Sequence, residues 1–290
     1  MAEERKVCVV TGSSSGIGAA TVKLYAKQGW NVVVNYSREA APAEAVASEC
    51  RELGADVLVA RADIAADADC KRLAGLVEAR FGRADVLVNN AGTTKFVAAK
   101  DLDGLDADDF QRIYAVNVIG AFQMVRAFAP LLGRQPGAAI VNVSSIASLM
   151  GTGSSLAYMA SKGALNALTI GLARSLGPAI RVNAIAPGLV ETPWMQNGLG
   201  ADRYAATVQS YRARSATSAF RCASRSCATA RSVTCSRRSS GPRRSCASST
   251  SSGCRRTGSS PSSMPTTSAS RARASTIATS AACPPGRCSL

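Results

Sequence analysis

The chain contains no histidine in its 290 residues. Histidine is the commonest general base and the commonest metal ligand, so its absence argues against a Ser-His-Asp triad and against most zinc sites. No Cys-x-x-Cys pair is present either, and we expect no metal site. Tyrosine, lysine and carboxylates remain as the groups that could transfer a proton, provided that their pKa values are shifted by their surroundings.

Long hydrophobic runs are also missing. No uninterrupted apolar run reaches the roughly 18 residues that cross a bilayer, although 47% of the residues are hydrophobic. The first ten residues, MAEERKVCVV, include acidic side chains where a signal peptide would be basic. We therefore expect a cytoplasmic protein without membrane contact, in which 290 residues suffice to bury a sizeable core.

Acidic residues are absent from one part of the chain. Residues 1–216 hold 22 Lys and Arg against 19 Asp and Glu, whereas residues 217–290 hold 12 Arg and no Lys, Asp or Glu. The second segment also contains seven of the ten cysteines and very few large apolar side chains. We therefore predict a folded domain at residues 1–216 and a disordered, low-complexity tail rich in Ser, Arg and Cys at residues 217–290.

The composition of this tail leaves its role open. Paired arginines would attract phosphates, so nucleic-acid binding is one alternative, but no aromatic residue follows Phe220 and bases would have no stacking partner. The cysteines are better explained as reactive surface thiols than as metal ligands. Because the loss of acidic residues is typical of GC-rich coding DNA read out of register, we predict that the tail arises from a shifted reading frame.

A glycine-rich turn follows the first apolar run. Residues 6–10 have the composition of a buried strand, and a helical pattern extends to Gln28 after the turn. In dinucleotide sites, three glycines permit the tight turn, the close approach of a pyrophosphate and the packing of helix on strand. An ordinary loop is the alternative, but this spacing favours a dinucleotide site. The predicted cofactor residues of the turn are Gly12, Ser14, Ser15, Gly16, Ile17 and Gly18.

The end of the second predicted strand, residues 31–35, indicates which cofactor is used. An NAD enzyme usually has an acidic residue here, which binds the ribose 2′-hydroxyl and would repel a 2′-phosphate. This chain has Asn35, Ser37 and Arg38 in that region and no acid. We therefore expect NADP(H) to be favoured over NAD(H).

Strand and helix patterns alternate through the rest of the domain. Strands are expected at 56–60, 85–88, 138–143 and 180–185, and helices at 42–53, 67–80, 106–132 and 158–176. Six such alternations predict a single doubly wound α/β (Rossmann) domain, with a parallel sheet and helices on both faces. Ligands bind beyond the carboxyl ends of such strands, and the residues there are Asp63, Ile64, Asn90, Ala91 and Gly92. A helix-capping or loop role for Asp63 is an equal alternative.

Tyr158 and Lys162 are the candidate catalytic pair. They are four residues apart in a helical pattern, so both side chains project from one face. An ammonium within about 4–6 Å favours the phenolate and lowers the tyrosine pKa from about 10 toward neutral. Ser145 follows the fifth predicted strand and could offer a hydroxyl to a substrate oxygen. A solvated helix face is the alternative for the isolated pair. Asn117, which is unfavourable inside a helix, is a further candidate.

With these motifs assembled, residues 5–195 resemble the short-chain dehydrogenase/reductase family of the single-domain type. The resemblance implies that Tyr158 is the general acid and base, that Lys162 lowers its pKa and holds the nicotinamide ribose, and that Ser145 orients the carbonyl. It also implies that Asn117 keeps a water in a proton relay. The interval of thirteen residues to Tyr158 selects Ser145 over Ser144. The motifs that remain are Asn89, which the resemblance places along the cofactor, and the cofactor residues Pro187, Gly188, Val190 and Thr192.

The resemblance implies an NAD(P)-dependent oxidoreductase that interconverts a carbonyl and a secondary alcohol of a small molecule. Within the family, the chain is most similar to 3-oxoacyl carrier-protein reductases and bacterial glucose dehydrogenases. Such proteins end in a further helix and a seventh strand, which commonly pack between subunits of a homo-oligomer. Residues 217–290 show neither pattern, so we expect six strands and an incomplete subunit interface. The alternative function is a catalytically impaired chain that binds a nucleotide but lacks a complete substrate pocket.

Overall fold

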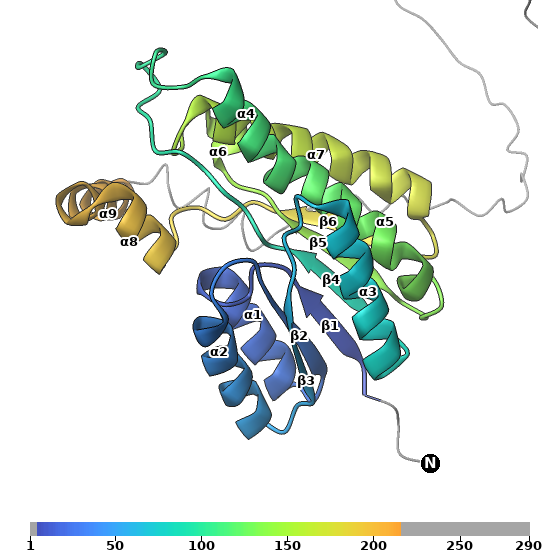
Figure 1. The fold of residues 1–290 in the computed structure, drawn as a ribbon. Helices are drawn as coiled ribbons and strands as arrows, with labels where there is room; N and C mark the ends of the chain where they lie inside the picture. Colours follow the sequence, from blue (N-terminus) through green and yellow to red (C-terminus); the bar gives the residue numbers. More distant parts are fainter. Residues whose placement is uncertain (1–4, 216–290) are drawn as a thin grey trace, which may run out of the picture. The chain divides into compact units, whose positions relative to one another are not determined.

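A computed structural model describes residues 5–215, all of which belong to one compact unit. The tail predicted at 217–290, with its expected disorder, lies outside the described residues. Six strands form one parallel sheet in the order β3-β2-β1-β4-β5-β6, with helices on both faces, so the doubly wound architecture is confirmed (Figure 1). The strands are β1 Val7–Val10, β2 Asn31–Tyr36, β3 Val57–Arg61, β4 Val86–Asn89, β5 Ala139–Val143 and β6 Arg181–Ile185.

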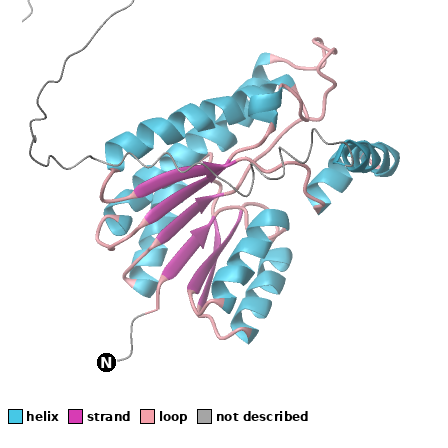
Figure 2. Cartoon of the chain, turned by 180° about the vertical axis from the view of Figure 1, so that it is seen from behind, coloured by secondary structure: helices cyan, strands magenta, loops and turns pink. Residues whose placement is uncertain are grey.

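Two apolar cores lie on opposite faces of this sheet. Successive side chains of a strand point to opposite faces, so Val7 and Val9 pack in one core while Cys8 and Val10 pack in the other. The first core includes side chains of α3 (Asp67–Phe81), α5 (Ala121–Leu132) and α7 (Leu156–Leu176), and the second those of α1 (Gly16–Lys27) and α2 (Ala40–Glu52). Figure 2 shows the strands enclosed between these two helix layers.

The single helix predicted at 106–132 is divided by a π-helical turn. Helix α4 (Ala107–Tyr114) begins with a capping box between Asp106 and Asp109, and the turn η1 (Ala115–Gly120) connects it to α5. By length and composition alone, the run Ala107–Leu132 could cross a membrane, but half of its most apolar window is buried inside this fold. It therefore packs as a core helix, with Asn117 at its widened turn.

Three helices that the sequence patterns did not predict follow β5 and β6. Helix α6 (Ala147–Met150) is a single turn between β5 and α7, and helices α8 (Pro193–Leu199) and α9 (Ala201–Ser215) follow β6. Proline at the first position of α8 has a fixed φ that suits a helix start. Figure 1 shows α8 and α9, in gold, displaced to one side of the sheet, next to the loop that follows β4.

Strand β6 forms one edge of the sheet. Arg181, Asn183 and Ile185 alternate onto one face, and all three side chains are exposed, with Ile185 at 47%. Within residues 5–215, β6 pairs with β5 alone. The six-strand sheet that the sequence predicts is therefore observed, and its last strand carries uncovered apolar surface.

Candidate active site

The glycine-rich turn lies where the strand order reverses, between β1 and β4. A Cβ atom added to Gly12, which has a φ of +59°, would lie 2.9 Å from Ala91 Cα. A Cβ on Gly18 would lie 2.5 Å from Asn90 Nδ2. Only glycine fits at both positions, so the backbone of the turn packs directly on the loop after β4. Such a reversal of strand order is where doubly wound sheets bind their ligands.

The N-terminus of α1, the helix that follows this turn, has the features of an anion-binding site. The N-cap residue of α1, Ser15, makes no side-chain capping hydrogen bond, and no acidic residue lies in the first turn. The first N–H groups of a helix have no partner within the helix, and the helix dipole favours negative charge at this end. A pyrophosphate therefore fits these residues, and the predicted dinucleotide cofactor agrees with the local structure.

Asn90 and Thr11 hold the two loops together. Asn90 Nδ2 donates to Thr11 O at 2.9 Å and to Gly12 O at 3.0 Å. The Thr11 hydroxyl oxygen accepts from the backbone N–H groups of Asn90 and Ala91, each at 3.0 Å. Asn90 therefore orders the cofactor edge of the sheet through its side-chain amide.

Three predicted cofactor residues make contacts within the protein: Asn35 and Ile64 are buried, and Asp63 is exposed. Asn35 is 2% exposed, and its Oδ1 accepts from Gly12 N at 3.0 Å while its Nδ2 donates to carbonyls at the end of β3. Ile64 is buried, and a Cβ on Gly120 would touch it at 2.9 Å. Asp63 Oδ1 accepts from Ala65 N at 3.0 Å, as in the loop-stabilising alternative. Asn35 thus connects the glycine turn to the end of β3 by hydrogen bonds.

Positive charge gathers beyond the end of β2. Ser37 and Arg38 are exposed there, as the sequence suggested. Arg61, at the end of the neighbouring β3, is also exposed, and its Nε donates to Ser37 O at 3.4 Å. The sequence analysis missed Arg61 because its position beside Ser37 results from the parallel pairing of β2 and β3.

The segment after β6 crosses toward the glycine turn. Pro187 O accepts from Ile146 N at 3.1 Å, and a Cβ on Gly188 would contact Ile146 at 3.5 Å. Thr192 Cγ2 lies 3.3 Å from the position of a Cβ on Gly16. Val190, between these contacts, is 38% exposed. The predicted cofactor residues from both ends of the domain therefore meet at one edge of the sheet.

Lys162 is buried, which removes the alternative of a solvated helix face. Its side chain is 3% exposed, and Nζ donates to Val143 O at 2.7 Å. The ammonium lies 5.7 Å from the centre of the Tyr158 ring and 3.7 Å from the position of a Cβ on Gly92. Burial lowers the pKa of Lys162 to about 8.

Tyr158 lies in the first turn of α7, and its pKa is shifted in the direction opposite to the prediction. Burial raises the pKa of Tyr158, and the hydrogen bond with the Ser145 side chain lowers it to a smaller extent. The predicted lowering by Lys162 is therefore wrong for this structure. The reason is geometric, because the ammonium faces the ring and the Val143 carbonyl and is itself desolvated.

The two serines after β5 have different surroundings. Ser144 is 3% exposed, and its hydroxyl donates to Lys162 O at 3.3 Å. Ser145 is half-buried, and its side chain lies near enough to that of Tyr158 to lower the tyrosine pKa. Its Oγ also accepts from Ala147 N at 3.1 Å, which fixes the hydroxyl at the start of α6. The structure thus places Ser145, the serine selected from the sequence, beside the tyrosine.

Asn117 braces the site from the π-helical turn. It is 1% exposed, and its Nδ2 donates to Thr93 O at 3.0 Å and to Ser161 Oγ at 2.9 Å. Its Oδ1 accepts from Thr93 N at 2.8 Å. Both N–H groups are thus engaged, and the side chain connects the loop after β4 to α7, which carries Tyr158 and Lys162.

Asn89 lies within the sheet, although the resemblance placed it along the cofactor. It is 3% exposed and donates to Asn142 Oδ1 at 2.9 Å, and Asn142 Nδ2 donates to Thr169 Oγ1 at 2.9 Å. Within residues 5–215, Asn89 Oδ1 accepts no hydrogen bond. These three side chains form a buried polar chain from β4 through β5 to α7.

Aromatic residues beside Tyr158 were not identified from the sequence. The ring centre of Trp194, in α8, lies 6.0 Å from that of Tyr158 and 5.9 Å from that of Phe96. Phe96 belongs to the loop after β4, so the fold brings together residues nearly one hundred positions apart. No local pattern could have revealed this contact.

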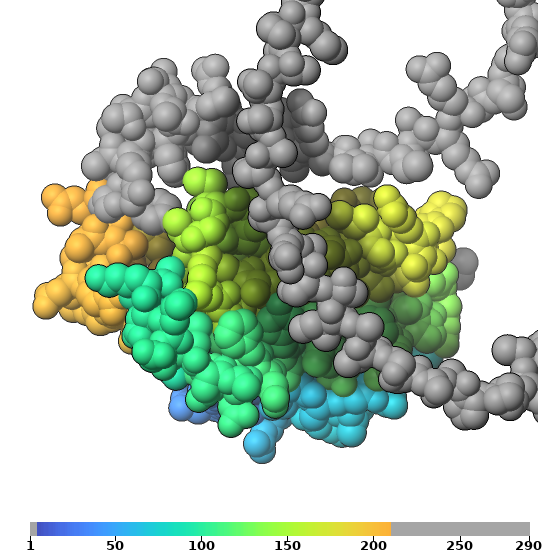
Figure 3. All heavy atoms as spheres, turned by 90° about the horizontal axis from the view of Figure 1, so that it is seen from above, coloured from blue at the N-terminus to red at the C-terminus, as the bar shows by residue number. Residues whose placement is uncertain are grey.

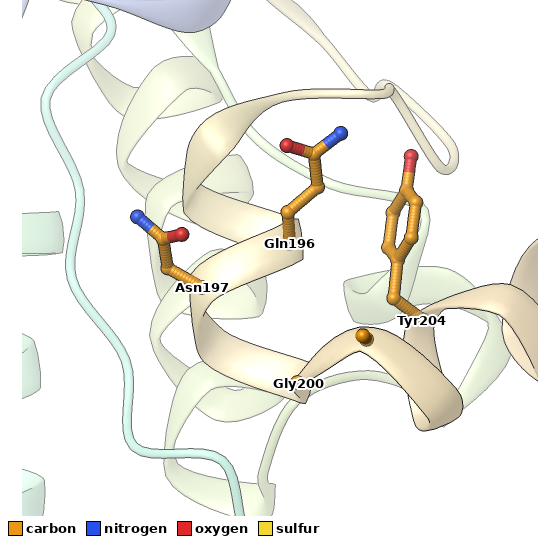
Figure 4. Close-up of a pocket in the computed structure, with 5 residues that line it drawn as sticks. Gln196, Asn197, Gly200 and Tyr204 are labelled. Atoms are coloured by element: carbon orange, nitrogen blue, oxygen red, sulfur yellow. The ribbon is translucent and has the colours of Figure 1, made fainter.

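A hollow of about 530 Å³ lies at the corner between α8 and α9. Figure 4 shows Gln196 and Tyr204 pointing to the same side of this corner, while Asn197 points away from them. The Tyr204 hydroxyl is buried and has no hydrogen-bond partner within residues 5–215. Neither Trp194 nor Tyr158 lines this hollow.

The chain is similar in sequence to known proteins. A family model described as short chain dehydrogenase matches residues 6–202. Over 196 residues, the chain is 44% identical to "Granaticin polyketide synthase putative ketoacyl reductase 2" of Streptomyces violaceoruber, covering 68% of this chain and 77% of that protein.

Solved structures share the fold as well. A crystal structure described as "a putative short-chain dehydrogenase/reductase from Burkholderia xenovorans" is 45% identical, with a TM-score of 0.65, and the match covers 68% of this chain and 82% of that one. The 3-ketoacyl-(acyl-carrier-protein) reductase of Brucella melitensis, complexed with NADH, is 36% identical with a TM-score of 0.60, over 66% of this chain and 78% of the other.

Proposed function

This chain belongs to the short-chain dehydrogenase/reductase family, and we propose that it reduces a ketone to a secondary alcohol with Tyr158 as the general acid. The observation that carries the proposal is the meeting of Ser145, Tyr158 and buried Lys162 at the edge of the sheet where the glycine turn lies. In the reverse direction, Tyr158 would act as the base.

The raised pKa of Tyr158 suits the reductive direction. A tyrosine with a pKa above 10 is protonated at neutral pH, so it can donate a hydrogen bond and then a proton to a carbonyl oxygen. Ser145 would donate a second hydrogen bond to the same oxygen. The Lys162 ammonium, 5.7 Å from the ring centre, would hold the ribose of the nicotinamide cofactor and does not set the pKa of Tyr158. The nicotinamide cofactor supplies the hydride when it is bound.

For the cofactor, we propose NADP(H). The uncapped N-terminus of α1 would bind the pyrophosphate, and Arg38, together with Arg61, would bind the 2′-phosphate. Thr192 and the exposed Val190, on the crossing segment, would lie beside the cofactor. The Brucella melitensis relative was crystallised with NADH, so the proposal rests on the two arginines and the absent acid of this chain.

For the substrate, we propose a small ketone of the 3-oxoacyl class in the cytoplasm. Relatives from Streptomyces violaceoruber and Brucella melitensis carry the names of ketoacyl reductases. The direct test incubates the protein with a 3-oxoacyl thioester and NADPH that carries deuterium at the transferable position. We expect a 3-hydroxyacyl product with deuterium on the carbinol carbon.

A second candidate function is nucleotide binding without turnover. The exposed side chains of β6 favour this candidate. If another segment must cover β6 to complete the substrate pocket and the subunit interface, a chain without that segment would bind the nucleotide and not turn over. Saturable NADPH binding with no deuterated product from any ketone tested would support this candidate and contradict the first.

A further inference from the structure

We propose that Phe96 and Trp194 form an aromatic wall beside Tyr158, and that this wall selects ketones whose carbonyl carries a flat apolar group. Gly198 sets the position of the wall. This inference rests on the proposed function, since it concerns the substrate of the same site. It adds a substrate property that the catalytic residues do not specify.

Trp194 lies between the catalytic tyrosine and Phe96. Its ring centre is 6.0 Å from that of Tyr158, at an interplanar angle of 49°, and 5.9 Å from that of Phe96, at 57°. Both distances lie in the range of attractive aromatic pairs. Nevertheless, Trp194 remains 42% exposed. A partly exposed indole beside the ring of the catalytic tyrosine offers apolar surface that a bound substrate would bury.

Gly198 allows α8 to lie directly on Phe96. Trp194 and Gly198 are four residues apart and share one face of the helix. A Cβ atom on Gly198 would lie 1.9 Å from Phe96 Cε2 and 2.4 Å from Cζ, distances that no real side chain tolerates. Any larger residue at position 198 must therefore move either the ring or the helix that carries Trp194.

The loop segment that carries Phe96 is held in place by its neighbours. Its neighbours in the chain are anchored, because Val97 N donates to Ser154 O at 2.8 Å and Lys95 Nζ pairs with Asp109 Oδ2 at 2.6 Å. The space-filling view shows the orange α8–α9 segment lying beside the teal loop that follows β4 (Figure 3). The wall is thus anchored to the loop, and α8 completes it.

The aromatic wall predicts that the protein prefers ketones with a planar ring over ketones with a puckered ring. A carbonyl oxygen held by Ser145 and Tyr158 leaves one substituent facing Trp194. A planar ring can make offset or edge contacts with the indole, whereas a puckered ring with the same number of carbons keeps its hydrogens between the two surfaces. Acetophenone and cyclohexyl methyl ketone form such a pair, because each joins a methyl ketone to a six-membered carbon ring.

The test measures ketone binding without turnover. In the Tyr158→Phe variant saturated with NADPH, which keeps the ring at position 158, calorimetry gives Kd for both ketones. We expect tighter binding of acetophenone, and we expect Trp194→Leu or Phe96→Leu to reduce the ratio of the two Kd values by roughly 2- to 12-fold. Gln196→Ala, on another face of α8, is the matched control and should leave the ratio unchanged.

A double-mutant cycle tests the role of Gly198. Gly198→Ala should reduce the Kd ratio in the presence of Phe96 and have little further effect in the Phe96→Ala background, which removes the clashing ring atoms. Gly171→Ala is the control, since a Cβ there meets nothing within 4 Å. In the Trp30→Phe background, which leaves Trp194 as the single tryptophan of the chain, Gly198→Ala should increase acrylamide quenching of the remaining fluorescence.

The outcomes separate this inference from the proposed function. Equal binding of the two ketones, an unchanged ratio in Trp194→Leu, or additive effects in the cycle would each overturn the aromatic wall, even if turnover of NADPH depended on Tyr158. Conversely, a shape-dependent Kd ratio that requires Trp194, in a protein that reduces no ketone, would leave the wall standing and contradict the catalytic proposal.

Discussion

At the scale of single residues, the candidate site depends on a buried cation beside a half-buried phenol. Lys162 loses its solvent, so its pKa falls to about 8, while burial raises the pKa of Tyr158. The two groups are therefore both protonated at neutral pH. Lys162 is charged in that state, and its charge is lost as the pH rises through about 8.

We predict that this titration controls cofactor binding. NADPH is an anion, so its Kd should increase as the pH rises from 7 to 9.5, with the change centred near pH 8. Lys162→Met should bind NADPH more weakly and with little dependence on pH over the same range. Fluorescence titration of NADPH at fixed ionic strength measures both. A wild-type Kd that is constant from pH 7 to 9.5 would contradict the role of Lys162.

The cofactor preference depends on exposed arginines. Arg38→Ala should weaken NADPH binding by about 1.5–3 kcal/mol and change NADH binding very little, because only NADPH has the 2′-phosphate. Arg174→Ala, which removes an exposed arginine of α7, is the charge-matched control. Parallel titrations with the two cofactors give the answer. Equal losses for NADPH and NADH would show that Arg38 does not recognise the phosphate.

Sequence patterns identified residues whose roles follow from local spacing. Tyr158 and Lys162 share a helix face, and Ser145 follows a strand, so their proximity could be predicted. The partners of Asn35 and of Trp194 could not, because Asn35 bonds to both the glycine turn and the end of β3, and Trp194 meets Phe96 only in the folded chain. The pKa of Tyr158 was predicted in the wrong direction because desolvation depends on the complete fold.

At the scale of elements, the predicted strands agree with the structure to within one residue at most ends, because buried parallel strands are short, continuous apolar runs. The helix at 106–132 was located correctly, but its π-helical turn was not predicted. That turn accompanies the hydrogen bonds of Asn117 to Thr93 and Ser161, which periodicity cannot reveal. Helices α8 and α9 were not predicted. Helix α8 is short and contains a glycine, so its pattern does not indicate a helix.

The tight packing of the glycine turn gives a prediction at this scale. Gly18→Ala places a Cβ 2.5 Å from Asn90 Nδ2 and 2.6 Å from Gly12 O, so the turn must open. We expect loss of most NADPH binding and destabilisation of about 1–3 kcal/mol. Gly75→Ala, in open space on α3, should be neutral or stabilising by about 0.5–1 kcal/mol. Urea unfolding and NADPH titration of both variants measure this. Wild-type binding in Gly18→Ala would contradict the packing.

At the scale of the whole molecule, β6 presents the exposed Ile185 and pairs on one side only within residues 5–215. An apolar edge strand can pair with another chain, so it favours aggregation. The match to the family model ends at residue 202, near the point where the composition changes.

We predict that the gene changes reading frame near codon 216. One of the alternative frames beyond this codon should encode a further helix and a seventh strand. The chain expressed from that restored frame should give a higher soluble yield, because the added strand would cover β6. Nucleotide sequencing and a comparison of soluble yields test this. If neither alternative frame encodes these elements, the tail is a genuine appendage.

The central claim is that Tyr158 transfers the proton, and one substitution tests it most directly. Tyr158→Phe removes the hydroxyl and keeps the ring, so the glycine turn and the packing on Trp194 should persist. With a 3-oxoacyl thioester and NADPH, we expect turnover to fall by about 100- to 10,000-fold, while the Kd for NADPH stays within about 2-fold of the wild type. Turnover in Tyr158→Phe close to that of an active wild-type protein would contradict the account.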